Sequence, residues 1–267
     1  MSSTATSSTD ARRQRVQSAE TGMSILKALT RLGGVASLSH LSNEVGESAS
    51  KVHRYISSFV QEGFVAQNPL TQHYYLSTES IRLGLAALRQ CDPVRLGESA
   101  LVRLRESLEV TCFIAVMGNM GPTVLRIEEP PVPVTVNIRA GSVLPILWSA
   151  TGQAFLAFTD DTKIHRKAQA EYEAGTPEQQ SMMSGSEPVD RLWRQIRDQG
   201  CAIVNDTLLR GISAVSAPVL DSNGHVCAVL TSLGASNGFD SRPGGAICPR
   251  MIKEASDISM AMGYEAP

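Results

Sequence analysis

Ser50, Lys51 and Arg54 lie within five residues of one another and carry groups that hydrogen-bond to phosphates and to base edges. The Arg54 guanidinium suits the paired acceptors of guanine, and the Lys51 ammonium suits a phosphate. His53 lies between them, and Ser48 just before them is a candidate N-cap of a helix. These side chains predict contact with double-stranded DNA. For each of them, an ordinary solvated helix face is the alternative.

Residues that could support catalysis or bind a metal are poorly grouped. The pairs Glu128-Glu129 and Asp160-Asp161 are neighbours in sequence, so their side chains point apart in a helix or a strand and cannot easily share a proton. The sequence contains no phosphate-binding loop, dinucleotide-binding fingerprint or nucleophile elbow. Its five cysteines form no CxxC pair, and its five histidines lack metal-ligand spacing. We predict reduced thiols, no metal and no cofactor, with an enzyme kept as a competing class.

The elements that must position the polar side chains are three short helices and a hairpin. Apolar residues recur at helical spacing over 18–32, 38–45 and 48–62, and two alternating runs follow at 64–66 and 74–76. This order is the layout of a winged helix-turn-helix, in which the last helix enters the major groove of DNA.

The third helix and the hairpin carry the candidate contacts. Val52, Ile56 and Phe59 share an apolar face that must pack on the other helices, so the polar residues named above face outward. At the hairpin, Gln72 and His73 are placed to contact the DNA backbone or the minor groove.

A break in the helical pattern predicts the domain boundary. The pattern that follows the hairpin stops at Asp92-Pro93, because proline and the residue before it disfavour a continuing helix. A length of 267 residues favours two domains over one large one. The Ser/Thr-rich and then basic start is either a solvated tail or an arm that helps to hold DNA. The predicted parts are a disordered arm (1–16), a winged helix-turn-helix domain (17–77), a linker helix (78–92) and a second domain (93–267).

The second domain alternates strand and helix patterns that predict an α+β fold with a largely antiparallel sheet. Ser222-Asn223-Gly224 is a hairpin signal between its last two strands. The expected strands are 111–118, 122–129, 134–139, 201–205, 212–220 and 225–233. The expected helices are 94–109, 149–158, about 160–173, 188–199 and about 245–262.

Charge is unevenly distributed over the chain. Residues 1–90 carry nine Lys/Arg against six Asp/Glu, whereas residues 91–267 carry fifteen against twenty, which gives the net charge of −2. A mildly basic front suits a nucleic-acid-binding head on an acidic body. Because we see neither a bilayer-length apolar run nor a signal-peptide pattern, we expect a cytoplasmic protein without a membrane partner.

Five segments, in order and at the right spacing, resemble the IclR family of bacterial regulators over residues 16–262. They include the triplet Val52-His53-Arg54 of the third helix and the wing exit YYLSTESIRLG. The full set is VQSAETGMSILKAL, LSHLSNEVGESASKVHRYISSFVQEGFV, YYLSTESIRLG, GSVLPILWSATGQAFLAF and GISAVSAPVLDSNGHVCAVLTSLG.

The resemblance implies a transcription regulator of a catabolic operon, either a repressor or an activator, controlled by a small organic acid. It implies a homodimer or tetramer assembled through the DNA-binding and linker regions. It also implies an effector-binding domain with a six-stranded GAF-like or profilin-like core. The alternative is a ligand sensor that acts through a protein partner without binding specific DNA.

The resemblance also places an effector pocket. Its carboxylate site consists of the backbone amides of Ala150 and Thr151 at a helix start, where free N–H groups favour an anion. Family members that bind small polar acids add four polar side chains, of which three are apolar in this chain. The four positions are Val204, Ala214, Thr231 and Leu233.

The apolar positions predict a ligand that is larger or less polar than glyoxylate, such as an aromatic carboxylate. Val136 and Trp148 are expected nearby and add apolar surface. The alternative is a vestigial pocket or a shift in strand register, in which case Asp206 and Thr207 supply polar contacts.

Overall fold

The structure, a computed structural model, describes residues 16–131, 138–183 and 185–265. The chain divides into two compact units, Met1–Gln90 and Cys91–Pro267. Each unit has a hydrophobic core of its own.

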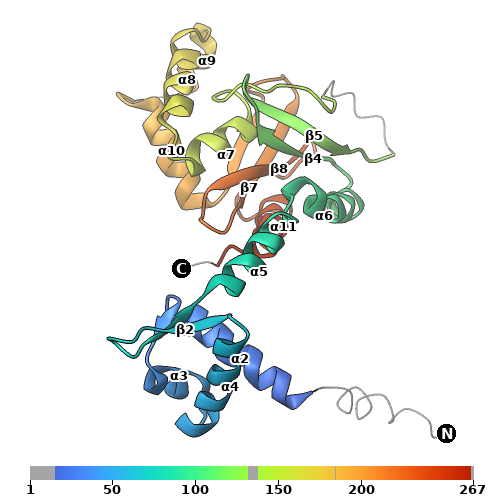
Figure 1. Ribbon diagram of the computed structural model, residues 1–267. Coiled ribbons are helices and arrows are strands. Elements are labelled where there is room, and N and C mark those ends of the chain that lie inside the picture. Colours follow the sequence, from blue (N-terminus) through green and yellow to red (C-terminus); the bar gives the residue numbers. More distant parts are fainter. Residues whose placement is uncertain (1–15, 132–137, 184, 266–267) are drawn as a thin grey trace, which may run out of the picture. The chain divides into compact units, whose positions relative to one another are not determined.

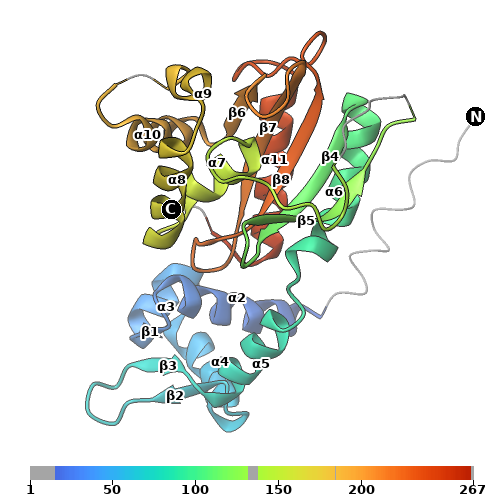
Figure 2. The same cartoon turned by 90° about the horizontal axis from the view of Figure 1, so that it is seen from above.

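The described part of the first unit contains three helices, a hairpin and a further helix, in the predicted order (Figure 1). The strands pair antiparallel in the order β1-β3-β2, and the hairpin of β2 and β3 projects from the helices (Figure 2). The elements are α2 (Gln17–Arg31), β1 (Val35–Ala36), α3 (Leu38–Val45), α4 (Ala49–Gln61), β2 (Val65–Gln67), β3 (Tyr74–Leu76) and α5 (Thr78–Leu88).

Two serine caps fix the starts of α3 and α4, and a glycine ends α3 at the turn between them. The Ser37 hydroxyl accepts a hydrogen bond from the His40 amide at the start of α3, and Ser48 accepts from Lys51 at the start of α4. Gly46 ends α3 with φ +67°, a conformation in which glycine is unstrained. Two helices are thereby joined by a short turn, as a helix-turn-helix requires.

The described part of the second unit is a five-stranded antiparallel sheet with helices on both faces. The strands lie in the order β5-β4-β8-β7-β6. The strands are β4 (Thr111–Met117), β5 (Pro122–Glu128), β6 (Ala202–Asn205), β7 (Ile212–Leu220) and β8 (Val226–Ala235). The helices are α6 (Pro93–Leu108), α7 (Ala150–Phe158), α8 (Thr162–Glu173), α9 (Pro177–Ser181), α10 (Pro188–Gln199) and α11 (Ile247–Ala261).

Helices α6 and α11 lie side by side on one face of this sheet, and α7 covers the other face (Figures 1 and 2). Helix α10 packs mainly on α7. Side chains alternate between the two faces of each strand, so odd and even positions of β7 and β8 pack into different hydrophobic cores. The α7 side of the sheet is the one on which the predicted pocket residues lie.

The predicted strand 134–139 is not observed as a strand in the described part of the chain, since residues 132–137 lie outside it and 138–140 are irregular. The chain instead runs beside β5 slightly later, where the Val124 amide donates to the Ser142 carbonyl at 2.9 Å and the Leu144 amide to Pro122 at 2.8 Å. These bonds give a single bridge between Thr123 and Val143. The six strands implied by the resemblance are therefore five among the described residues.

Candidate functional site

Helix α4 presents a polar face to solvent. Val52 and Ile56 are buried in the core of the first unit, and their burial turns Ser50, His53 and Arg54 outward. The structure thus brings these three predicted contacts to one exposed surface of a helix. It does not itself test whether they touch DNA.

The two cations of α4 differ in their surroundings. Lys51 Nζ lies 2.6 Å from Glu47 Oε1, and both side chains are about one-third exposed. Arg54 is exposed and forms no ion pair with any described residue. A phosphate at Lys51 must compete with Glu47, whereas Arg54 is available for an incoming acceptor.

Two other predicted contact residues, Ser48 and Gln72, already form hydrogen bonds within the protein. Ser48 is the N-cap of α4, so its hydroxyl is already an acceptor for the Lys51 amide. Gln72 adopts φ +58° at the hairpin tip, where its side-chain Nε2 donates to the Pro69 carbonyl at 2.8 Å. His73 beside it is half-buried. These residues shape the helix start and the wing, and only their remaining surface is free for DNA.

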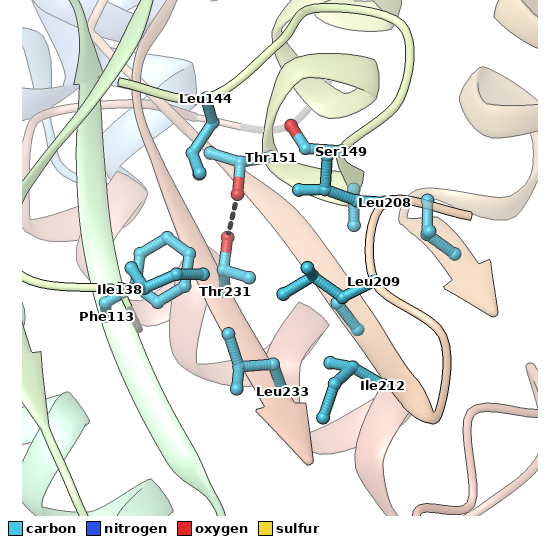
Figure 3. A pocket seen from close by; sticks show the side chains of 13 residues that line it. Phe113, Ile138, Leu144, Ser149, Thr151, Leu208, Leu209, Ile212, Thr231 and Leu233 are labelled. Atoms are coloured by element: carbon cyan, nitrogen blue, oxygen red, sulfur yellow. Dashed lines mark hydrogen bonds between the residues drawn. The ribbon is translucent and has the colours of Figure 1, made fainter. Parts of the chain in front are cut away.

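A narrow cavity of about 40 Å³ lies between the start of α7 and the sheet of the second unit (Figure 3). The pairing of three neighbouring strands explains which residues form the floor of the cavity. Val204 pairs with Ala214, and Ala214 pairs with Leu233. Thr231 lies two residues before Leu233 and therefore on the same face. The lining residues are Phe113, Ile138, Leu144, Ser149, Ala150, Thr151, Val204, Leu208, Leu209, Ile212, Ala214, Thr231 and Leu233.

The structure brings together most of the effector residues predicted from the sequence. The two residues of the helix start and all four of the strand positions line this cavity: Ala150, Thr151, Val204, Ala214, Thr231 and Leu233.

Trp148 and Val136 do not join this group. The Trp148 ring does not line the cavity but packs with Ile146 and Leu156 in a separate cluster, against the backbone of Gly175. The cause is the extended backbone at Ser149, which directs the residue before it away from the cavity. Val136 lies outside the described residues.

Seven lining residues were missed by sequence reasoning: Phe113, Ile138, Leu144, Ser149, Leu208, Leu209 and Ile212. Phe113 pairs with Thr231 across β4 and β8, and the sequence does not reveal that these two strands are neighbours. The adjacent Leu208 and Leu209 carried a usable signal, because two leucines in a connecting loop are unusual unless they cover something.

The start of α7 is fixed by a close approach of two backbone segments. The Ser149 hydroxyl accepts from the Gly152 amide at 2.9 Å and donates to the Pro145 carbonyl. The Glu171 carboxylate accepts from the Ile146 and Leu147 amides at 3.0 and 2.8 Å. With this segment held in place, a Cβ at position 152 would lie 2.2 Å from Pro145 O, so the position requires glycine.

The first amides of α7 remain available for a ligand. Those of Ala150 and Thr151 donate to no acceptor among the described residues, as expected for the first turn of a helix. Both residues line the cavity, at the positive end of the helix dipole. This arrangement favours an anion.

A chain of three buried hydroxyls adds a further donor. Thr151 Oγ1 and Thr231 Oγ1 are 2.9 Å apart (Figure 3). Thr231 Oγ1 is also 2.8 Å from Ser216 Oγ. Three hydroxyls have three protons, and two contacts use only two of them. Because Ser216 is fully buried outside the cavity, with Thr231 as its one described partner, the spare proton is best placed on Thr151 or Thr231, which face the cavity.

The cavity therefore combines hydrogen-bond donors at one end with apolar walls elsewhere. None of its lining residues is ionisable, so it offers no general acid or base. No group of three or more metal-ligating side chains occurs within the ranges that the structure describes. An apolar cavity with a few convergent polar groups is typical of a site that binds a small molecule.

The alternative polar contacts at Asp206 and Thr207 do not reach this cavity. Asp206 Oδ1 accepts from the Gly211 amide at 2.6 Å and from the Ser236 hydroxyl at 3.0 Å. The Thr207 hydroxyl donates to the Asn205 carbonyl. Both side chains are thus hydrogen-bonded away from the cavity, and Val204 pairs with Ala214 in the register of β6 and β7.

The five cysteines are free thiols, and three of them lie in surroundings that keep them protonated. Burial raises the pKa of Cys112 to about 12 and that of Cys227 to about 11. A hydrogen bond with Cys248, together with burial, raises the pKa of Cys201. Thiolate nucleophiles are disfavoured at these positions.

Comparison with known proteins agrees with both units. The family profile of the IclR helix-turn-helix domain matches residues 18–69, and that of the bacterial transcriptional regulator IclR C-terminal domain matches residues 86–260. The crystal structure of Pseudomonas aeruginosa HmgR is 39% identical in sequence with a TM-score of 0.84, covering 94% of this chain and 100% of that one.

Two named regulatory proteins are similar to this chain over most of its length. The acetate operon repressor of Salmonella typhimurium is 23% identical over 255 residues, covering 93% of this chain and 91% of its own. The Pca regulon regulatory protein of Pseudomonas putida is 22% identical over 213 residues, covering 78% of this chain and 71% of its own.

Fold and matches together define the class as a DNA-binding regulator of transcription, which rules against an enzyme. Within that class, the chain belongs to the IclR family of bacterial transcriptional regulators. No described helix combines the length and apolar composition that crossing a bilayer requires.

Proposed function

We propose that the protein regulates a catabolic operon, as a repressor or an activator, and that an aromatic or otherwise apolar carboxylate in the cavity beside α7 sets its affinity for operator DNA. The observation that carries this proposal is a helix start with two free amides that opens on an apolar cavity. The names of two relatives, which refer to the acetate operon and the Pca regulon, support control at the level of operons.

The chemistry of the cavity supports the ligand class. The Ala150 and Thr151 amides and one hydroxyl proton supply donors for a carboxylate, while Val204, Ala214 and Leu233 offer nothing to the hydroxyl or keto group of a small polar acid. An apolar body gains free energy in proportion to the apolar area that it buries, roughly 25 cal/mol per Å².

Titration calorimetry with benzoate, glyoxylate and pyruvate tests the ligand class. Benzoate is expected to bind more tightly than either aliphatic acid. A matched measurement with benzamide, which lacks the charge, is expected to show much weaker binding because the helix start favours an anion. Tight binding of glyoxylate or pyruvate with none of benzoate would contradict the proposed class.

For the DNA-binding unit, the proposal assigns base and phosphate contacts to the outward face of α4, with Ser50, His53 and Arg54 at its centre. Lys51 and the wing residues Gln72 and His73 contribute backbone contacts. We propose that the DNA-binding domain covers residues 17–77, the linker helix 78–92 and the effector-binding domain 93–267. Gel-shift titration of the upstream DNA is expected to give an affinity that falls steeply with salt concentration.

We also propose that the protein is a homodimer or a tetramer and that it binds its DNA in the cytoplasm. Helix α5 supports assembly, because none of its residues is buried although it carries exposed Ile81, Leu83, Leu85 and Leu88. Exposed apolar side chains gathered on one helix mark an interaction surface. Light scattering measures the assembly state directly.

A further inference from the structure

Two leucines of the loop that joins β6 to β7 close the cavity on its solvent side. Leu208 and Leu209 line the cavity and yet are 39% and 44% exposed. Phe113 and Thr231 on the sheet, by contrast, are each 1% exposed. Side chains that contact both the cavity and the solvent form the wall through which a ligand enters.

This loop, residues 206–211, is held firmly at its base and loosely at its tip. Asp206 Oδ1 accepts from the Gly211 amide and from the Ser236 hydroxyl, and the Ser236 amide donates to the Gly211 carbonyl at 2.8 Å. Within the described chain, the backbone amides of 208–210 donate no hydrogen bond. The Leu209 carbonyl accepts from the Ile212 amide at 3.2 Å, and among the described residues the tip is otherwise held by side-chain packing. It therefore opens more readily than the strands beside it.

The size of the cavity requires such an opening. Its volume is about 40 Å³, whereas a cavity that takes benzene has roughly 150 Å³. The walls formed by the sheet and α7 cannot retreat without breaking strand ladders or the close contact at Gly152. Of the sheet, α7 and the leucine tip, the tip is the wall that can move.

We propose that Leu208 and Leu209 form a gate that selects ligands by size: the closed tip admits a small acid, and the tip swings outward to admit a ring and then packs over it. This gate rests on the proposed effector site, since it assigns the residues that contact the apolar body of the ligand. It makes the loop tip, rather than the strand positions alone, a determinant of specificity.

The double substitution Leu208→Ala/Leu209→Ala tests the gate in the full-length protein. Calorimetry and stopped-flow binding of benzoate and pyruvate are compared with the wild type. Benzoate is expected to bind about tenfold more weakly, with faster association and much faster dissociation, because the tip no longer obstructs entry or covers the ring. Pyruvate, which binds without moving the tip, keeps its affinity.

Leu125→Ala is the matched control, because Leu125 is 41% exposed on β5 and does not line the cavity. It is expected to leave both acids unaffected. An equal loss of benzoate and pyruvate binding in the double variant, or no change for benzoate, would overturn the gate.

The outcomes separate the gate from the proposed effector class. If the wild type binds pyruvate but not benzoate, the aromatic class is wrong, and the gate stands only if the double variant gains benzoate binding. If neither protein binds either acid, both proposals are overturned.

Discussion

At the scale of single residues, Gly152 is the position at which α7 and the segment before it approach most closely. A Cβ there would lie 2.2 Å from Pro145 O and 2.4 Å from Ile146 O, both backbone atoms that cannot rotate away. We expect Gly152→Ala to destabilise the second unit by about 3 kcal/mol, which lowers its Tm by roughly 6 to 12 °C. Thermal unfolding followed by circular dichroism measures the shift.

Gly244→Ala is the control for this substitution. Position 244 has no atom within 4 Å of an added Cβ, so the change is expected to leave the Tm nearly unaltered. Equal Tm values for Gly152→Ala and the wild type would show that the 145–152 segment relaxes freely, contrary to the packing seen.

Arg54 and Lys51 on α4 provide a second contrast between residues. Because Arg54 has no ion-pair partner among the described residues and Lys51 is paired with Glu47, we expect Arg54→Ala to weaken operator binding by about tenfold or more and to relax site preference. Lys51→Ala is expected to lose less affinity for DNA, and by the same factor for every DNA sequence. Gel shifts over a range of salt concentrations, with operator and scrambled DNA, distinguish the two; a larger loss of site preference in Lys51→Ala would contradict this assignment.

Strand alternation explains how much of the cavity the sequence could predict. Positions 204, 214, 231 and 233 fall on one face because each strand has a period of two residues and the hairpin signal fixes the register of β7 and β8. Phe113 was out of reach, because its strand is distant in sequence and pairs with β8 only in the fold. Trp148 was misplaced because one extended residue, Ser149, reverses the direction of a side chain.

At the scale of elements, the long periodic helices were predictable and the shortest elements were not. Strand β1 has two residues and exists through its pairing with β3, where Val35 lies opposite Tyr75. Helix α9 has five residues and depends on a capping box between Thr176 and Gln179. Neither element is long enough to produce a hydrophobic period, so only tertiary pairing or capping reveals it.

Among the described helices of the first unit, α5 is the one that contributes no side chain to the hydrophobic core. We expect Leu85→Gln to weaken self-association by about tenfold while leaving the Tm of the first unit unchanged, because the Leu85 side chain is 48% exposed and no residue of the helix is buried. Arg82→Gln introduces the same residue at a polar position of the same helix and is the matched control. Light scattering over a dilution series measures both, and equal association constants for the two variants would contradict an interface on this face.

At the scale of the whole molecule, the proposed ligand site and the α4 face belong to different units. Any control of DNA binding by an acid is therefore a coupling free energy between two separate sites. Such a coupling is reciprocal: if benzoate changes the affinity for operator DNA by a given factor, operator DNA must change the affinity for benzoate by the same factor. The factor itself is typically about 5- to 150-fold.

Reciprocity gives a prediction that needs no knowledge of how the two units are arranged. We expect operator DNA at saturation to shift the benzoate affinity measured by calorimetry, in the same direction and by the same factor as saturating benzoate shifts the operator affinity measured by gel shift. Arg54→Ala supplies the control, because a protein that no longer engages the operator should bind benzoate as the free protein does. Benzoate binding that is identical with and without operator, in a protein that binds both, would mean that the cavity does not regulate transcription.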